Sequence, residues 1–266
     1  FHIQRIASYA DTIVEYGEEL TQTWNNQQKV DIHHDMMTVT MRIIAKVLFD
    51  ADVSKDANDL GEAINVGIKA AMHKITHVFT LPDWVPTKMN RDSKAAFQLL
   101  DDTIAAIIDS RRETMADNGD LLSMLLLSED ENGERMDDKQ VRDEAMTLFL
   151  AGHETTANAL TWTFYRLAQH PHICQKLLDE VDQVLGKRSA TIDDLKDLTY
   201  TEMVIKETMR LHPPAWIMTR IVTDPFELSK FTAQVNDLLI VSPYLNHRDV
   251  NLWDDPETFD PQRFTP

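Results

Sequence analysis

AMTLFLAGHETTANALTWTFY, residues 145–165, is the most apolar helical stretch of the chain, and it holds one formal charge, the carboxylate of Glu154. An acid in such surroundings is expected to be buried, and burying a charge is costly unless something compensates for it. Gly152 lies two residues before the acid, although glycine inside a helix costs about 1 kcal/mol relative to alanine. Because departures from local rules concentrate at functional sites, we expect such a site here.

The composition excludes several classes of partner. The chain has 266 residues, a net charge of −18 and a pI of about 4.8, so it repels phosphate backbones and no nucleic-acid partner is expected. Its single cysteine, Cys174, allows no intrachain disulfide and suits a reducing compartment such as the cytoplasm. Residues 145–165 could span a bilayer by length. However, eight of the 21 are Thr, His, Glu or Asn, so we expect a buried core helix and no transmembrane segment.

Helical periodicity dominates the sequence, and the presence of only 7 Gly and 10 Pro argues against a barrel or sandwich of many turns. We therefore expect one mainly α-helical domain over residues 1–266, with a small β portion near the C-terminus. The expected helices cover about 6–24, 37–48, 60–72, 93–115, 121–127, 137–169, 171–185 and 200–211. The expected strands lie near 221–222, 226–228 and 238–241.

The longest of these helices is predicted to begin at Asp137, because Asp137 and Gln140 have capping-box-like spacing. Its apolar and small residues predict one inward stripe, with apolar residues on other sides as well, so we expect the helix to be surrounded by protein. The stripe comprises Val141, Ala145, Leu148, Gly152, Thr155, Ala159 and Trp162.

Residues 77–90 form a loop, because Pro82 and Pro86 end any helix there, and Trp84 and Val85 add apolar bulk. One interpretation is a connector folded onto the core, which the residues slightly favour. The other is a mobile lid over an apolar pocket.

Small and polar residues meet in the middle of the long helix. The missing side chain of Gly152 would open a groove where a small molecule can approach the backbone. Thr155 can donate into that groove or bond back to the carbonyl of Ala151, and Glu154 can relay protons behind it. The alternative is a helix–helix contact made by small residues, and both interpretations stay open. A zinc site beginning at His153 is excluded, because the motif needs a second His at the position of Ala157.

Charged residues also recur in the last third of the chain. Glu207 and Arg210 are spaced i, i+3 and can pair on one helix face. Arg220 stands among apolar residues in the run IMTRIV and therefore needs an anionic partner such as a carboxylate or phosphate. Arg263 follows in the run PQRF.

Together these motifs resemble the cytochrome P450 haem-thiolate monooxygenases, in the same order and over essentially the whole chain. The run AGHETT, residues 151–156, is similar to that family's oxygen-activation segment. The pair Glu207 and Arg210 is similar to its Glu-x-x-Arg motif. Residues 246–264, ending in PQRF, are similar to its segment that ends Pro-x-Arg-Phe.

The resemblance implies a P450-like fold that binds haem b, with Ala151, Gly152 and Thr156 along one haem face and Arg220 paired with a propionate. Glu154 and Thr155 would deliver protons to dioxygen at the haem. Glu207, Arg210 and Arg263 would form a buried structural network.

By the same resemblance, the protein would insert one oxygen atom of dioxygen into an apolar small molecule. Its electrons would come from a donor protein, a ferredoxin- or flavoprotein-type reductase. The 77–90 loop would lie near the substrate entrance, which strengthens the lid interpretation.

The main departure from the family is its axial cysteine, which follows the Pro-x-Arg-Phe segment. Cys174 lies in HPHICQKLLDE without a neighbouring glycine, so we interpret it as an ordinary helix residue and assign no metal ligand. The chain therefore resembles an internal fragment, and an N-terminal membrane anchor upstream of Phe1 stays possible. Expressed alone, it is expected to bind haem poorly and aggregate. The alternative is a degenerate relative that keeps the helical scaffold only for binding.

Overall fold

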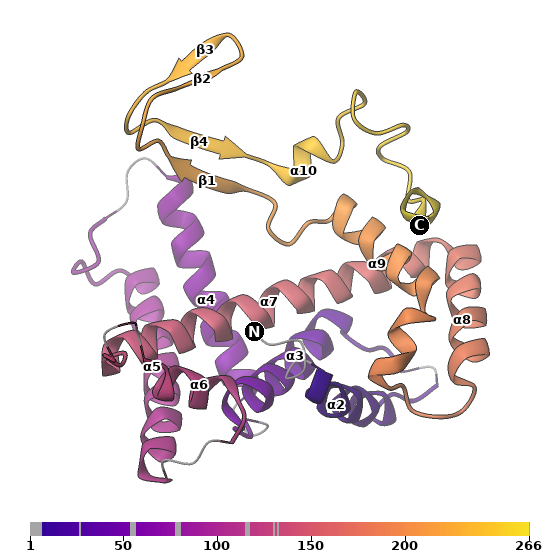
Figure 1. Cartoon of the computed structure of the whole chain (residues 1–266), viewed down its shortest axis with the longest axis horizontal. Coiled ribbons are helices and arrows are strands. Elements are labelled where there is room, and N and C mark those ends of the chain that lie inside the picture. The colour runs from indigo at the N-terminus through magenta and orange to yellow at the C-terminus, as the bar shows by residue number, and fades with distance from the viewer. Residues whose placement is uncertain are drawn as a thin grey trace. The chain divides into compact units, whose positions relative to one another are not determined.

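The computed structural model describes residues 7–26, 28–53, 57–77, 81–114, 118–129, 131 and 133–265. The chain divides into two compact units, Phe1–Ala157 and Asn158–Pro266, and the boundary falls inside the longest helix. The first unit is helical, and the second adds small antiparallel sheets near the C-terminus (Figure 1). The predicted fold class, mainly α with a small β portion, is therefore confirmed.

The first unit contains α2 (Ala10–Gln22), α3 (Ile32–Phe49), α4 (Ala57–Thr76), α5 (Lys88–Thr114), α6 (Leu121–Leu127) and the longer part of α7 (Asp138–Gln169). Helices α4 and α5 pack along each other, and α3 packs against α4 and α6. Fully buried apolar side chains from four of these helices form one core, including Met41 of α3, Leu60 of α4, Leu100 of α5 and Val141 of α7.

Aspartates begin three of these helices. The side chain of Asp31 accepts from the backbone N–H of His34, and Asp120 begins α6 in the same way. The carboxylate of Asp137 accepts from the backbone N–H of Gln140 at 2.7 Å, so the predicted start of α7 is confirmed.

The first predicted helix differs from the structure. Helix α2 starts at Ala10 instead, and its residues are partly buried or exposed, with none fully buried. Trp24 lies beyond the end of α2 and donates its indole N–H to the carboxylate of Asp35 at 2.8 Å. Ile6, the first residue of that predicted helix, and Met115, the last of the fourth, lie outside the described residues.

The buried face of α7 also differs from the predicted stripe. From Val141 to Ala157 its buried residues recur every four positions, whereas the predicted stripe alternated steps of four and three. They are Val141, Ala145, Phe149, His153 and Ala157, and Thr163 is buried nearer the end of the helix. Thr155 and Trp162 of the predicted stripe are exposed, and so are Phe164 and Tyr165, so the described residues do not surround this helix. Repeated steps of four drift around a helix of 3.6 residues per turn, so the buried line winds away from Thr155.

Only part of the 77–90 loop is described, since Val78, Phe79 and Thr80 are outside the described residues. The side-chain amide of Asn90 donates to the carbonyls of Pro82 and Val85, and α5 begins at Lys88. Trp84 is 82% exposed, so its bulk is not folded onto the core as the connector interpretation required. The lid interpretation stays a prediction.

The second unit contains the end of α7, then α8 (Pro171–Leu185), the 3-10 helix η1 (Ile192–Lys196) and α9 (Thr199–Leu211). An arm of nested β-strands follows: β1 (Met218–Ile221) pairs with β4 (Leu238–Val241), and between them β2 (Phe226–Leu228) pairs with β3 (Phe231–Ala233), both antiparallel (Figure 1). The chain ends with α10 (Pro243–Asn246) and the 3-10 helix η2 (Pro261–Phe264), which lies against α9. Strand β3 was not predicted.

Within the part of the chain that is described, no helix has both the length and the hydropathy needed to cross a membrane.

Candidate functional site

The middle of α7 exposes a face of small residues. Ala151, Thr155 and Thr156 are all exposed. The hydroxyl of Thr155 donates to the carbonyl of Ala151 at 2.7 Å, which is one of the two arrangements expected from the sequence. A threonine that bonds back to residue i−4 loosens that turn of the helix, and its oxygen can still accept a further hydrogen bond. This face can therefore contact a bound molecule.

Gly152 does not open the groove that its missing side chain predicted. A Cβ at this position would lie 2.6 Å from Cδ1 and 3.1 Å from Cγ1 of Ile44 on α3. The space is therefore filled by a side chain of the neighbouring helix. The glycine lets α3 and α7 approach closely, which is the alternative that the sequence left open.

His153 faces α3 as well. It is fully buried, and its Nε2 lies 3.0 Å from the carbonyl oxygen of Met37. Because a carbonyl can only accept, Nε2 carries the proton, and the buried Nδ1 has no partner in the described part of the molecule. Burial, opposed by the hydrogen bond to Met37, lowers the pKa of His153 to about 4, so the ring is neutral near pH 7.

Glu154 is half-buried. Burial raises the pKa of its carboxyl group, and the nearby positive charge of His33 partly opposes that shift. Among residues whose placement is described, its carboxylate makes no ion pair. It is therefore an acid that gains and loses a proton more readily near neutral pH than an exposed glutamate, beside the exposed face of Thr155.

Glu207, Arg210 and Arg263 lie together in the second unit. Glu207 and Arg210 are fully or almost fully buried and form a two-point pair at 2.6 and 2.9 Å. Arg263 approaches the same carboxylate at 3.5 Å, and the backbone N–H of Asp260 donates to it at 2.9 Å. Two charges this deeply buried are tolerated because each has several partners.

Arg210 also ties α9 to the irregular end of the chain. Its guanidinium donates to the backbone carbonyls of His247, Pro256 and Thr258, and it lies over the ring of Trp253 at 5.0 Å. These contacts hold residues 247–260 on α9, which is a structural task and leaves no donor of this arginine directed at a ligand.

Arg220 lies on strand β1, in the second unit. It is exposed, and the one hydrogen bond that its guanidinium makes to the described residues is to the carbonyl of the preceding Thr219. No carboxylate of the described chain lies within ion-pair distance of it. The anionic partner that its apolar neighbours predicted is therefore not supplied by the described protein residues.

Sequence reasoning missed a second cluster in this unit. Arg166 donates from Nε to Nε2 of His212 at 2.9 Å, and the ring of Trp162 stacks on His212 at 3.9 Å. Burial and the charges of Arg166 and Arg248 lower the pKa of His212 to about 4. The i, i+4 spacing of Trp162 and Arg166 was a signal, but their shared partner His212 follows Arg166 by 46 residues.

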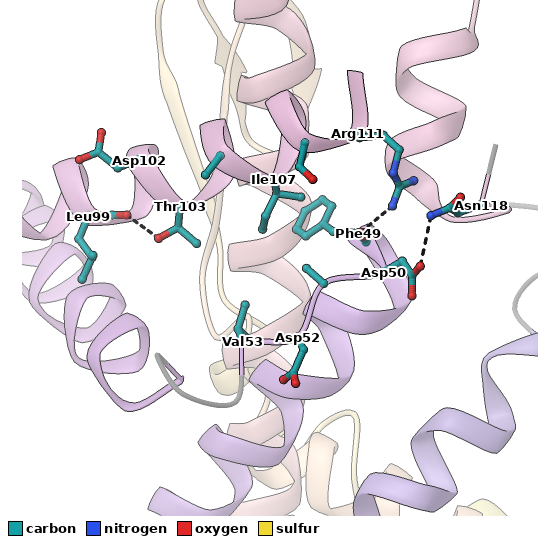
Figure 2. A pocket seen from close by; sticks show the side chains of 13 residues that line it. Phe49, Asp50, Asp52, Val53, Leu99, Asp102, Thr103, Ile107, Arg111 and Asn118 are labelled. Atoms are coloured by element: carbon teal, nitrogen blue, oxygen red, sulfur yellow. Dashed lines mark hydrogen bonds between the residues drawn. The ribbon is translucent and has the colours of Figure 1, made fainter. Parts of the chain in front are cut away.

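A cavity of about 710 Å³ lies between the end of α3 and α5, away from the predicted site (Figure 2). Its lining includes Phe49, Asp102 and Ile107, but none of the predicted site residues. The buried guanidinium of Arg111 at its edge is held by the carboxylate of Asp120 and the carbonyl of Phe49. The charged group at the edge of this cavity is thus bound by other protein groups, and the cavity does not identify the functional site.

Comparison with known proteins agrees with the motif order. The family model described as Cytochrome P450 matches residues 1–266. The chain is 35% identical over 269 residues to cyclooctatin synthase of Streptomyces melanosporofaciens, covering 100% of this chain and 59% of that protein. It is 33% identical to cyclooctat-9-en-7-ol 5-monooxygenase of the same organism, over 99% of this chain and 58% of that protein. It is 30% identical to pentalenene oxygenase of Streptomyces avermitilis, over 91% of this chain and 54% of that protein. The chain thus spans somewhat more than half the length of these relatives.

Proposed function

Because the chain belongs to the cytochrome P450 family, we propose that the full-length protein is a haem-dependent monooxygenase acting on an apolar small molecule. The observation that carries the proposal is the pairing on α7 of an exposed small-residue face with a half-buried acid whose pKa is raised. An enzyme that must add protons to a reacting oxygen in a water-poor site needs this combination.

The residues present fit a haem b group. Ala151 and Thr156 are small and exposed, so their turn of helix can lie against a flat ring without a steric clash. Arg220 lacks a carboxylate partner among the described residues, and a propionate would supply one. Cys174 is half-buried within α8, so we propose that the thiolate bound to iron comes from another part of the full-length protein. Gly152 acts by letting α3 approach and not by contacting the ring.

The haem, when bound, supplies the iron that activates dioxygen. Thr155 lies at the exposed face, where its oxygen can accept or pass a proton while its own hydrogen is held by the Ala151 carbonyl. Glu154 lies beside it and holds the next proton, since its raised pKa brings it closer to neutral pH. Glu207, Arg210 and Arg263 keep the last part of the chain folded and take no part in the chemistry.

The names of two relatives indicate the class of substrate. They describe oxygenation of cyclooctat-9-en-7-ol and of pentalenene. We therefore propose a substrate that is largely hydrocarbon, with electrons supplied by a ferredoxin- or flavoprotein-type donor. The second class of function, a scaffold that has lost its chemistry, is distinguished by the test below.

The test uses the full-length protein, reduced and exposed to carbon monoxide. A thiolate-type shift of the Soret band, together with transfer of one atom of isotope-labelled dioxygen into pentalenene or a similar hydrocarbon, is the expected result. A stably folded full-length protein that binds no haem would support the scaffold function and contradict the enzyme.

A further inference from the structure

Trp84 is the most exposed large apolar side chain among the described residues, at 82%. Leu81 in the same loop is 61% exposed, and Pro82 and Pro86 beside them are exposed as well. The loop joins α4 to α5, two helices that pack along each other (Figure 1). Because apolar surface is normally removed from water, several such side chains together on one loop indicate a contact with something outside these residues.

Hydrogen bonds fix the backbone that presents Trp84. The side-chain amide of Asn90 donates to the carbonyl oxygens of Pro82 at 3.0 Å and of Val85 at 2.9 Å. The backbone N–H of Val85 also donates to the carbonyl oxygen of Pro82, at 3.0 Å. Trp84 is therefore exposed on an ordered turn whose contacts do not depend on the indole.

The charge around this loop is opposite in sign to that of the whole chain. Residues 69–94 hold five Lys or Arg against two Asp, although the net charge of the chain is −18. One of these aspartates, Asp83, is paired with Lys74 at 2.6 Å. Three of the cations are exposed and have no ion-pair partner among the described residues. They are Lys88, Arg91 and Lys94.

The first turn of α5 departs from a local rule at the same place. It contains Lys88 and Arg91 and no acidic residue. The free backbone N–H groups at the start of a helix favour negative charge there, so these cations oppose the helix dipole. Departures of this kind concentrate at functional positions. The cations and the helix dipole together make this end of α5 attractive to anions.

Two features favour an anionic lipid surface as the partner. Tryptophan is enriched at the membrane–water interface, and cations close to an anionic leaflet are attracted to its headgroups. A protein partner would have to cover about 800 Å² of this surface, whereas a bilayer can accept a single loop with a few apolar side chains. The acidic remainder of the chain does not prevent this contact, because salt screens repulsion beyond about 8 Å at physiological ionic strength.

We propose that residues 81–94, the loop and the start of α5, form a docking site for an anionic lipid surface. The two exposed apolar side chains, Leu81 and Trp84, enter the headgroup layer, and the three free cations contact anionic headgroups. The contact is reversible, because one loop buries little apolar surface. Docking is independent of the function proposed above, since it can be measured without turnover.

The experiment uses the full-length protein and vesicles of phosphatidylcholine, with and without anionic phosphatidylglycerol. Brominated acyl chains in these lipids quench tryptophan that enters the bilayer. Trp84→Phe keeps the apolar bulk but removes the fluorophore, so the quenching that it abolishes belongs to position 84. Lys88→Glu combined with Arg91→Glu reverses the charge of the loop. Lys187→Glu combined with Lys230→Glu makes the same change of charge at two exposed lysines elsewhere. Circular dichroism verifies that each variant is folded.

In the wild type, anionic vesicles should quench Trp84 at lower lipid concentrations than neutral vesicles do. The variant with both Lys88 and Arg91 reversed should need about thirtyfold more anionic lipid for the same quenching, since each cation at such a surface contributes roughly fivefold. High salt should weaken the quenching in the wild type. The control with Lys187 and Lys230 reversed should match the wild type.

Three results would overturn the inference. If Trp84→Phe leaves the quenching by lipid unchanged, the loop does not touch the bilayer, whatever else in the full-length protein does. If neutral vesicles quench Trp84 as well as anionic ones, or if the control variant is weakened equally, the three cations do not recognise the lipid. If acrylamide cannot reach Trp84 in the full-length protein without vesicles, another part of that protein covers the loop.

Discussion

Replacing Gly152 with alanine tests whether this position is a contact between helices or an open groove. The new Cβ would lie 2.6 Å from Cδ1 of Ile44, about 1 Å closer than two carbons normally approach. Forcing an extra methyl group into a filled space costs about 1–3 kcal/mol. The gain in helix propensity offsets about 1 kcal/mol of this. We therefore expect Gly152→Ala to destabilise the full-length protein by about 1 kcal/mol.

Two further variants test whether the effect comes from the contact between Gly152 and Ile44. At Gly17 in α2, an added Cβ meets nothing within 4 Å, so Gly17→Ala should stabilise the protein by about 0.5–1 kcal/mol through propensity alone. Ile44→Ala removes both atoms that the new methyl group would contact. In that background, Gly152→Ala should also become stabilising, by about the same amount as Gly17→Ala.

The assay is urea unfolding of the four proteins in this cycle, the wild type, the two single variants and the double variant, followed by circular dichroism. The coupling energy between positions 44 and 152 should be about 1–3 kcal/mol, in the direction of mutual clash. If Gly152→Ala is as stabilising as Gly17→Ala with Ile44 still present, α3 and α7 do not approach as described, and the reasoning on this face of α7 is wrong.

Three more predictions concern the buried charges, the buried histidine and the cofactor. Glu207→Ala or Arg210→Ala should each destabilise the full-length protein by about 3–5 kcal/mol in urea unfolding, because each leaves the other charge buried and unpaired; a loss below about 1 kcal/mol would contradict the network. The pKa of His153 lies near 4 in the folded state and near 6.5 in the unfolded state, so its contribution to the free energy of unfolding is complete above pH 6.5 and is lost as pH falls toward 4. In the wild type this loss should amount to about 3 kcal/mol between pH 6.5 and 4, and His153→Gln should remove it, as measured by unfolding at several pH values. An unchanged pH dependence would mean that His153 is not neutral when buried. Arg220→Gln should speed haem transfer to an excess apoprotein acceptor several-fold, whereas Lys230→Gln in the β2–β3 turn should not, and equal transfer rates would remove Arg220 from the haem site.

Local patterns in the sequence predicted much of the fold. Asp137 and Gln140 located the start of α7, and Pro171 and Gly186 bracket α8. These signals depend on backbone hydrogen bonds and φ angles within a few residues, so they can be read without knowing the rest of the molecule.

Contacts between distant segments could not be predicted in this way. The buried line of α7 passes through His153 because Met37, 116 residues earlier, accepts its proton. The sequence predicted a groove at Gly152, because the residues near it in the chain give no sign that Ile44 of α3 fills the space. Strand β3 is a three-residue segment that pairs with β2. Tertiary partners, and not local propensity, decided these positions.

In the candidate site, too, the sequence predicted contacts between residues close in the chain and missed contacts between distant ones. Glu207 and Arg210 lie one turn apart on α9, so their pairing follows from spacing alone. The stacking of His212 on Trp162 joins the residue after the end of α9 to α7, 50 residues earlier in the chain, and carried no comparable signal.

The most direct test of the proposed function compares hydrogen peroxide and product in the full-length protein and two threonine variants. Thr155 and Thr147 are both exposed on α7, and each donates its hydroxyl to the carbonyl four residues earlier at 2.7 Å. Thr155→Ala should divert most of the consumed dioxygen to peroxide, while Thr147→Ala should keep the wild-type ratio. If peroxide and product are the same in all three proteins, α7 does not deliver protons through Thr155, and the proposed mechanism is contradicted.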